Sequence, residues 1–224
     1  MNTALIGSNG TIGSSILTRM LFTHVYNSDN INEMKLNTFD LVVVAAPSGN
    51  RLAVNKDPAL DLLNIGAIMD AILHTQINCT VLISTIDAIA YPDTAYGRHR
   101  LQLEKFVKIH CNNYHILRLS TLIGQAIKKN VLFDLKNNLF IDKINPASVI
   151  QWCPLDTLHN EIDYVIKNNV KELNLVSEPI TNQDLIGEFF PTVATQSKTE
   201  TKYYDVTPYR YTRKEIYTAI RNYL

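Results

Sequence analysis

Residues 3–13 have the sequence TALIGSNGTIG, a short apolar run followed by three glycines in the pattern GxxGxxG. The apolar run predicts a strand at 3–6, and residues 12–22 predict a helix with one apolar face, formed by Ile12, Ile16, Leu17 and Met20. Glycines between a strand and a helix permit a tight turn and a close approach of the backbone to a pyrophosphate. The segment therefore predicts a dinucleotide-binding turn, and the alternative is an ordinary glycine turn.

The chain beyond this segment alternates apolar runs with amphipathic stretches. Strands are predicted at 24–27, 40–46, 79–85 and 115–119, and helices at 58–73 and 96–110. The run DLVVVAA at 40–46 is typical of a strand covered on both faces. The inward residues of the first long helix are predicted to be Leu62, Ile65, Met69 and Ile72, and those of the second Leu103, Phe106, Val107 and His110. The alternation predicts an α/β fold, a Rossmann-like doubly wound parallel sheet.

The last hundred residues change in character and predict a smaller C-terminal lobe. Helices are expected at 130–138, 155–167, 181–190 and 212–223, and strands at 148–153 and 173–176. Thr181 with Asp184 and Thr212 with Glu215 have the spacing of helix capping boxes. We expect one boundary, between a core of residues 1–124 and a lobe of residues 125–224 packed on it.

Composition excludes several classes of protein. The chain has 224 residues, of which 46% are hydrophobic and 19% charged, which argues against disorder. Its 21 basic and 21 acidic residues leave no basic excess, so neither a nucleic acid nor a membrane surface is expected as a partner. Three scattered cysteines and six histidines without metal-ligand spacing predict neither disulfides nor a metal site. The first residues lack a signal-peptide pattern, and a cytoplasmic protein is expected.

Two later segments contain the candidate catalytic residues. Residues 83–85 are Ile-Ser-Thr at the end of a predicted strand, and residues 96–100 are Tyr-Gly-Arg-His-Arg on a predicted helix. Together with the glycine turn, they resemble the IS[ST] and YGxxK motifs of the extended short-chain dehydrogenases/reductases, the NAD-dependent epimerase/dehydratase family. The resemblance covers nearly the whole chain. It departs from the family pattern at Arg100, where the family has its catalytic lysine.

The resemblance implies Tyr96 as the catalytic acid/base, with Thr85 and Ser84 as hydroxyl partners that orient a substrate oxygen. Tyr96 and Arg100 are four residues apart, so they lie on one face of a helix. A free phenol has a pKa near 10, and a neighbouring cation is expected to lower it. Arg100 would also contact the nicotinamide ribose. The alternative is an ordinary surface pair of tyrosine and arginine.

The resemblance also implies a nicotinamide cofactor. No arginine is near to hold the 2′-phosphate of NADP, so NAD is favoured and NADP remains possible. Asp29 or Asn27 would bind the adenosine ribose, Ile31 would lie near adenine, and the small side chains of Ala45 and Ala46 would leave room for the adenosine. Asp29 has the alternative of a solvated turn residue. The cofactor-binding residues are expected to be Gly7, Asn9, Gly10, Thr11, Ile12, Gly13, Asn27, Asp29, Ile31, Ala45, Ala46, Tyr96 and Arg100.

The segment from Leu117 to Gly124 resembles the LRxxxxxG segment of the family, which makes the lobe the substrate-binding part. The substrate would be a nucleotide sugar used in bacterial surface-polysaccharide synthesis, and its contacts are expected from Lys129, Asn130 and Arg213. Asp87 is a weaker candidate for an acid, and Trp152 is expected in the core. A homodimer through helices 58–73 and 96–110 is implied, with Ile68 and Leu101 outside the inward faces. The alternative function is a non-enzymatic NAD(P)-binding sensor.

Overall fold

The computed structural model describes residues 1–195, 197–199 and 203–224. The chain divides into two compact units, one of residues 1–118 and 157–173, and one of residues 119–156 and 174–224. This division differs from the single boundary expected at 124/125, because the chain returns to the first unit after the second has begun. The returning segment contains helix α7 (Leu158–Lys167), which buries an apolar stripe of Leu158, Ile162 and Val165.

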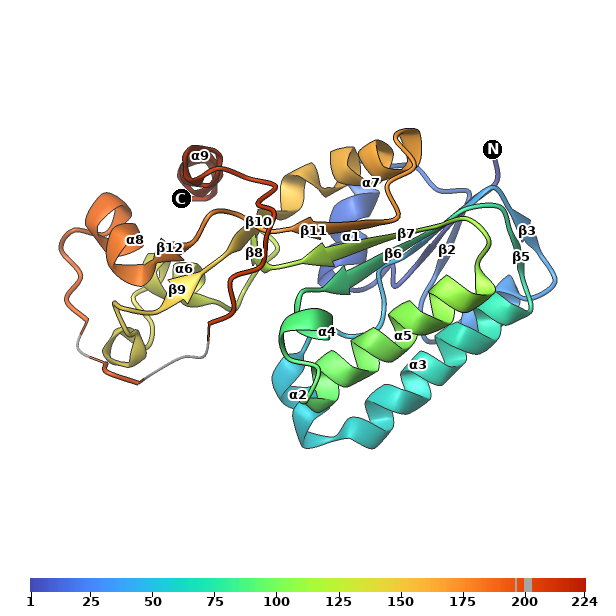
Figure 1. The fold of residues 1–224 in the computed structure, drawn as a ribbon, viewed down its shortest axis with the longest axis horizontal. Coiled ribbons are helices and arrows are strands. Elements are labelled where there is room, and N and C mark those ends of the chain that lie inside the picture. The colour runs from blue at the N-terminus through green and yellow to red at the C-terminus, as the bar shows by residue number, and fades with distance from the viewer. Residues whose placement is uncertain (196, 200–202) are drawn as a thin grey trace. The chain divides into compact units, whose positions relative to one another are not determined.

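A six-stranded parallel sheet forms the centre of the first unit, in the order β11-β7-β6-β4-β1-β2 (Figure 1). The strands are β1 (Thr3–Ile6), β2 (His24–Tyr26), β4 (Leu41–Val44), β6 (Thr80–Thr85), β7 (Tyr114–Leu119) and β11 (Glu172–Leu175). Ile6 pairs with Tyr26 and with Val44, and Val44 pairs with Leu82, so the carboxyl ends of four parallel strands meet at one edge. The prediction of a Rossmann-like doubly wound α/β fold is confirmed.

Helices cover both faces of this sheet. Helices α3 (Pro58–Leu73) and α5 (Ala95–His110) lie side by side on one face, and α1 (Thr11–Leu17) and α7 lie on the other (Figure 1). The shorter elements are α2 (Arg51–Lys56), α4 (Asp87–Ala90), the 3-10 helix η1 (Ile31–Met34), and the paired strands β3 (Thr38–Phe39) and β5 (Gln76–Ile77). The apolar core includes Ala4, Ile6, Phe39, Val42, Ile65, Leu82, Leu103 and Ile116.

Three expectations for the helices were wrong. Helix α1 ends at Leu17 instead of residue 22, because Thr23 already bonds to Thr3 at the start of β1 and the chain must turn to reach it. On α3, Leu62 is 40% exposed and its neighbour Asp61 is buried in its place, since charged partners on α5 bind that carboxylate. His110, at the last position of α5, is also exposed.

The second unit contains short elements. They are β8 (Thr121–Ile123), β9 (Val149–Ile150), β10 (Trp152–Pro154), β12 (Ile180–Thr181), α6 (Val131–Lys136), α8 (Asn182–Phe189), α9 (Arg213–Tyr223) and the 3-10 helices η2 (Ile141–Lys143) and η3 (Leu155–Thr157). Both predicted capping boxes are confirmed, at Thr181 and Thr212. Trp152 is fully buried, as expected of a core residue. Within the described residues, no helix is long and apolar enough to cross a membrane.

Candidate functional site

The three glycines of the turn after β1 differ in what a side chain would meet at each position. Gly7 has φ +92°, and a Cβ atom there would lie 2.6 Å from the carbonyl oxygen of Ala45. A Cβ atom on Gly13 would lie 2.1 Å from the carbonyl oxygen of Gly7. The fold itself therefore requires glycine at both positions. Gly10 is exposed at φ −77°, and its Cβ would meet only the Gly7 oxygen, at 3.3 Å.

The turn leads into α1 without a side-chain cap. Gly10 is the N-cap residue, and no described side chain accepts a hydrogen bond from the first turn of this helix. By contrast, Asp57 caps α3 and Thr94 caps α5. The first amides of a helix have no acceptor within it, so those of α1 are open to a ligand. Asn9, Gly10 and Thr11 are exposed, and the space above Gly10 suits a pyrophosphate group.

The loop after β2 separates the two candidates for the adenosine ribose. The side-chain oxygen of Asn27 accepts a hydrogen bond from the Asp29 N–H at 2.7 Å, so it is used within the turn. The Asp29 side chain is exposed, and one of its oxygens accepts a hydrogen bond from the adjacent Ser28 hydroxyl at 3.3 Å. Asp29 therefore keeps acceptor capacity for a diol. Ile31 is 5% exposed within the core, so the structure does not bring it to a surface where it could contact adenine.

The two alanines after β4 lie against the glycine turn. A Cβ atom on Gly7 would be 3.1 Å from the Cβ of Ala46 and in collision with the carbonyl group of Ala45. Both alanines are half-buried. The end of β4 thus lies close to the glycine turn, and the small side chains of both alanines are compatible with room for a nucleoside.

Tyr96 lies in a buried cluster at the start of α5. Its side chain is 8% exposed, and its N–H donates to the Asn55 side chain at 3.0 Å. The Arg100 guanidinium carbon lies 4.5 Å from the centre of the Tyr96 ring. The structure therefore brings together the two residues that the sequence paired.

Arg100 differs from the expectation because its charge is already paired. Both of its terminal nitrogens donate to Asp61 of α3, at 2.9 and 3.0 Å, and one also donates to the Ser48 carbonyl at 2.7 Å. The side chain is only 5% exposed. It could not reach a nicotinamide ribose without breaking this pair, so the ribose contact expected of Arg100 is not supported by the geometry.

The pKa of Tyr96 is raised above the ordinary value for a tyrosine, whereas the sequence led us to expect a lower one. Burial is the largest cause, because it disfavours the charged phenolate. Arg100 and Arg51 act in the opposite direction, and Asp87 adds to the effect of burial. Tyr96 is therefore protonated at neutral pH.

The Ser84 hydroxyl of β6 is already used in a buried contact with α5. Its hydroxyl donates to Glu104 at 2.6 Å, and Glu104 is fully buried and bound by Arg118. Adjacent strand residues point to opposite faces, so Thr85 points away from this pair. The Thr85 hydroxyl accepts a hydrogen bond from the Asp87 N–H at 3.3 Å. Ser84 thus serves the packing of α5 on the sheet, and Thr85 is bound to Asp87, whose charge acts on Tyr96.

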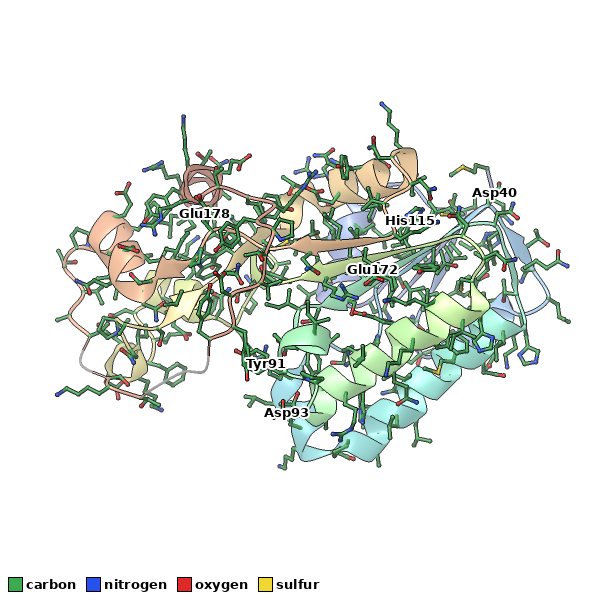
Figure 2. The ribbon with its side chains drawn as sticks, in the orientation of Figure 1. Asp40, Tyr91, Asp93, His115, Glu172 and Glu178 are labelled. Atoms are coloured by element: carbon green, nitrogen blue, oxygen red, sulfur yellow. The ribbon has the colours of Figure 1, made fainter. Side chains whose placement is uncertain are left out.

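Two charged residues near Tyr96, Arg51 and Asp61, were not assigned from the sequence. Arg51, at the start of α2, pairs with Asp87 and lies 5.8 Å from the centre of the Tyr91 ring. Tyr91 is labelled in Figure 2, in the turn between α4 and α5. Asp87 is 1% exposed, and burial raises the pKa of its carboxyl despite Arg51. The burial of Asp61 could have been predicted from the sequence, because Asp61 lies four residues before Ile65 and so shares its buried helix face.

The substrate candidates of the second unit have mostly structural partners. The Asn130 side chain accepts from the Phe133 N–H at 2.9 Å and donates to the Leu122 carbonyl at 2.8 Å, so it caps α6. Arg213 donates to the Pro179 carbonyl at 3.1 Å and lies 3.3 Å from Asp184. Lys129 is exposed. The sequence could not distinguish a capping asparagine from a ligand-binding one.

Comparison with known proteins finds similarity in structure. Neither a protein-family model nor a curated protein sequence matches the chain. A dTDP-4-dehydrorhamnose reductase ortholog from Clostridium acetobutylicum is 19% identical, with a TM-score of 0.71 over 100% of this chain and 98% of that one. A UDP-glucuronic acid 4-epimerase from Bacillus cereus, solved with UDP-4-deoxy-4-fluoro-glucuronic acid and NAD, is 14% identical, with a TM-score of 0.69 over 88% and 85%.

The capsular polysaccharide assembling protein CapF from Staphylococcus aureus is 18% identical, with a TM-score of 0.62 over 84% of this chain. The chain spans 56% of the length of CapF. These similarities agree with the central parallel sheet of six strands. The chain therefore has the fold of the extended short-chain dehydrogenases/reductases, the NAD-dependent epimerase/dehydratase group.

Proposed function

We propose that this protein is an NAD(P)-dependent enzyme that acts on a nucleotide sugar. The observation that carries the proposal is Gly10, an exposed glycine whose Cβ would meet only the Gly7 carbonyl oxygen, at 3.3 Å, at an uncapped helix start after the first strand of this fold. Space for a pyrophosphate accounts for that glycine. The nucleotide sugars named for the reductase and epimerase structures support the substrate class.

Residues of the first unit fit the dinucleotide. The glycine turn and the first amides of α1 would hold the pyrophosphate, Ala45 and Ala46 would leave room for the adenosine, and Asp29 would accept from its ribose. An acid at that position disfavours a 2′-phosphate, so we propose NAD, with NADP as the alternative. When bound, the cofactor would exchange a hydride with a sugar carbon.

Tyr96 and Thr85 would carry out the proton transfer to the sugar oxygen. A buried, protonated Tyr96 is ready to give its hydroxyl proton to a sugar oxygen, and Thr85 would orient that oxygen. Giving a proton suits the reduction of a keto sugar, so we propose the reductive direction rather than epimerisation or dehydration. The similarity to CapF supports a role in surface-polysaccharide synthesis. We also propose that the protein forms a homodimer.

A non-enzymatic NAD(P)-binding sensor is the second candidate. The pairing of Arg100 with Asp61 favours it, because a paired cation gives Tyr96 less help in losing a proton. Turnover distinguishes the two functions. The enzyme is expected to oxidise NADH with a member of a panel of dTDP- and UDP-linked 4-keto sugars, and Tyr96→Phe is expected to abolish this while retaining NAD binding. Wild-type protein that binds NAD but turns over none of the panel would favour the sensor.

The cofactor site is tested by substitution at Gly10. Gly10→Val would fill the space above the turn, so we expect NAD affinity to fall at least about tenfold in calorimetric titration, a loss of about 1.4 kcal/mol. The melting temperature should change little. Gly187→Val is a matched control, because a Cβ atom at that helical glycine meets nothing within 4 Å. Equal NAD affinity in Gly10→Val and the wild type would contradict the cofactor site.

A further inference from the structure

A buried ion pair joins the two long helices, α3 and α5, next to the ring of Tyr96. Asp61 of α3 and Arg100 of α5 are each 4% exposed, and two parallel hydrogen bonds of 2.9 and 3.0 Å connect them. His99 places its Nδ1 atom 2.8 Å from the same carboxylate. Such a two-bond pair sets the plane and position of the guanidinium, as well as adding energy.

The ion pair fixes the position of the guanidinium group that contacts the Tyr96 ring. The guanidinium that Asp61 holds lies 4.5 Å from the centre of the Tyr96 ring. The planar fork of an arginine can bind a carboxylate with one edge and still lie over a ring, which a lysine ammonium cannot do in the same way. The Asp61 carboxylate carries the opposite charge and binds the guanidinium directly, so it opposes the effect by which Arg100 lowers the pKa of Tyr96.

We propose that Asp61 is a positioning residue, which holds Arg100 over Tyr96 and opposes its charge, so that Tyr96 keeps its proton until substrate is bound. This inference rests on the proposed role of Tyr96 as proton donor. It explains why an arginine can stand where the resembled family has a lysine: the cation here positions the phenol without ionising it.

The other charged groups around Tyr96 are compatible with this role. They come from every helix packed against it, namely His99 on α5, Asp87 on α4 and Arg51 on α2, besides Asp61 on α3. Arg51 and Asp87 form their own ion pair, so their effects on Tyr96 oppose each other. Burial is the largest cause of the raised pKa of Tyr96, and the Arg100 charge acts against it.

The test is a pH titration of Tyr96 by NMR, with tyrosine labelled with carbon-13 at the ζ position. The signal of Tyr96 is assigned by its loss in Tyr96→Phe. Asp61→Asn keeps the size of the side chain and one oxygen for Arg100, but it removes the negative charge. We expect the pKa of Tyr96 to fall by about one pH unit, which is a tenfold larger phenolate fraction at a given pH. Asp70→Asn, on the same helix but paired with Lys35, should leave the titration unchanged.

A double variant keeps the inference testable if Asp61→Asn folds poorly. Asp61→Asn with Arg100→Gln removes both charges and leaves no unpaired buried cation, so Tyr96 should titrate close to the wild-type value. An unchanged Tyr96 titration in folded Asp61→Asn, or a pKa for the double variant well below the wild-type value, would overturn the inference. The titration needs no cofactor or turnover. Loss of NAD binding or activity would therefore count against the proposed function alone, and an altered titration would still support the role of Asp61.

Discussion

At the scale of single residues, unit 1 contains an unusual number of buried charges, and each has a partner. Asp61, Asp87, Arg100, Glu104 and Arg118 are all no more than 6% exposed. Burial disfavours the charged form of a group unless hydrogen bonds and an opposite charge compensate for it. For Asp87 the compensation is incomplete, since burial raises the pKa of its carboxyl even with Arg51 bound.

This shift predicts how Asp87 affects stability. A carboxyl whose pKa is higher in the folded than in the unfolded state binds its proton more tightly when folded. Its contribution to stability is therefore lost as the pH rises from the unfolded pKa, about 3.9, through the folded one. We expect Asp87→Asn to raise the free energy of unfolding at pH 7 by roughly 0.5–2 kcal/mol, a gain typical of substitutions at functional sites.

Thermal unfolding of the two proteins from pH 3 to pH 8 measures this effect. The gain should shrink as the pH falls, because the wild-type carboxyl is then also neutral. Asp93→Asn is the control, since Asp93 is exposed in the turn between α4 and α5 (Figure 2). A lower melting temperature for Asp87→Asn at pH 7 would mean that the bond to Arg51 outweighs the burial of the charge.

At the scale of elements, α5 is attached along its whole length. Thr94 caps its start, Arg100 joins it to α3, and Glu104 joins it to two sheet strands through Ser84 and Arg118. Arg118 of β7 also binds Glu172 on β11, which is labelled in Figure 2. The helix that carries Tyr96 is thus held by polar bonds at three points along its length, which the role proposed for Tyr96 would require.

Arg118→Met should show how strongly this attachment depends on charge pairing. It would leave Glu104, which is fully buried, without its main partner, so we expect a loss of about 3–5 kcal/mol in the free energy of unfolding. Urea denaturation measures it as a lower midpoint with the slope unchanged. Adding Glu104→Leu should restore much of the loss, because the double variant buries no unpaired charge. A loss below about 1 kcal/mol in Arg118→Met would show that water or Ser84 satisfies Glu104.

At the scale of the whole molecule, the proposed homodimer has a different apolar surface from the one suggested by the sequence. Ile68, expected outside the inward face of α3, is 4% exposed and belongs to the core of its own chain. The exposed apolar stripe of α3 consists of Leu60, Leu63 and Ala67, and Leu63 is 72% exposed. Such a stripe is costly to leave in water and suits a second copy of the helix.

Sedimentation at micromolar concentration should therefore give a particle of twice 25.4 kDa. Leu63→Glu is expected to shift it to the monomer, because a charge would be buried in the interface. Leu21→Glu is a matched control, as Leu21 is 96% exposed but lies in the loop after α1. A wild-type protein that sediments only as a monomer would contradict the homodimer.

The fold could be predicted because its signals are local. The valine-rich run predicted a buried strand, which is β4, and the spacing of Thr212 and Glu215 predicted the start of α9. The helix predicted at 58–73 has the same bounds as α3. Hydrophobic periodicity and capping involve residues within about four positions of each other, so the chain determines them before any tertiary contact forms.

The candidate site could be predicted only in outline. By itself, the sequence determined the glycine turn, the parallel sheet and a tyrosine with an arginine one helical turn away. Only the tertiary structure decided that Arg100 binds Asp61, which is 39 residues away, that Ser84 binds Glu104, and that residues 157–173 return to the first unit. The physical reason is that a side chain's partners and its burial depend on which helix packs opposite it, and no pattern along one helix contains that information.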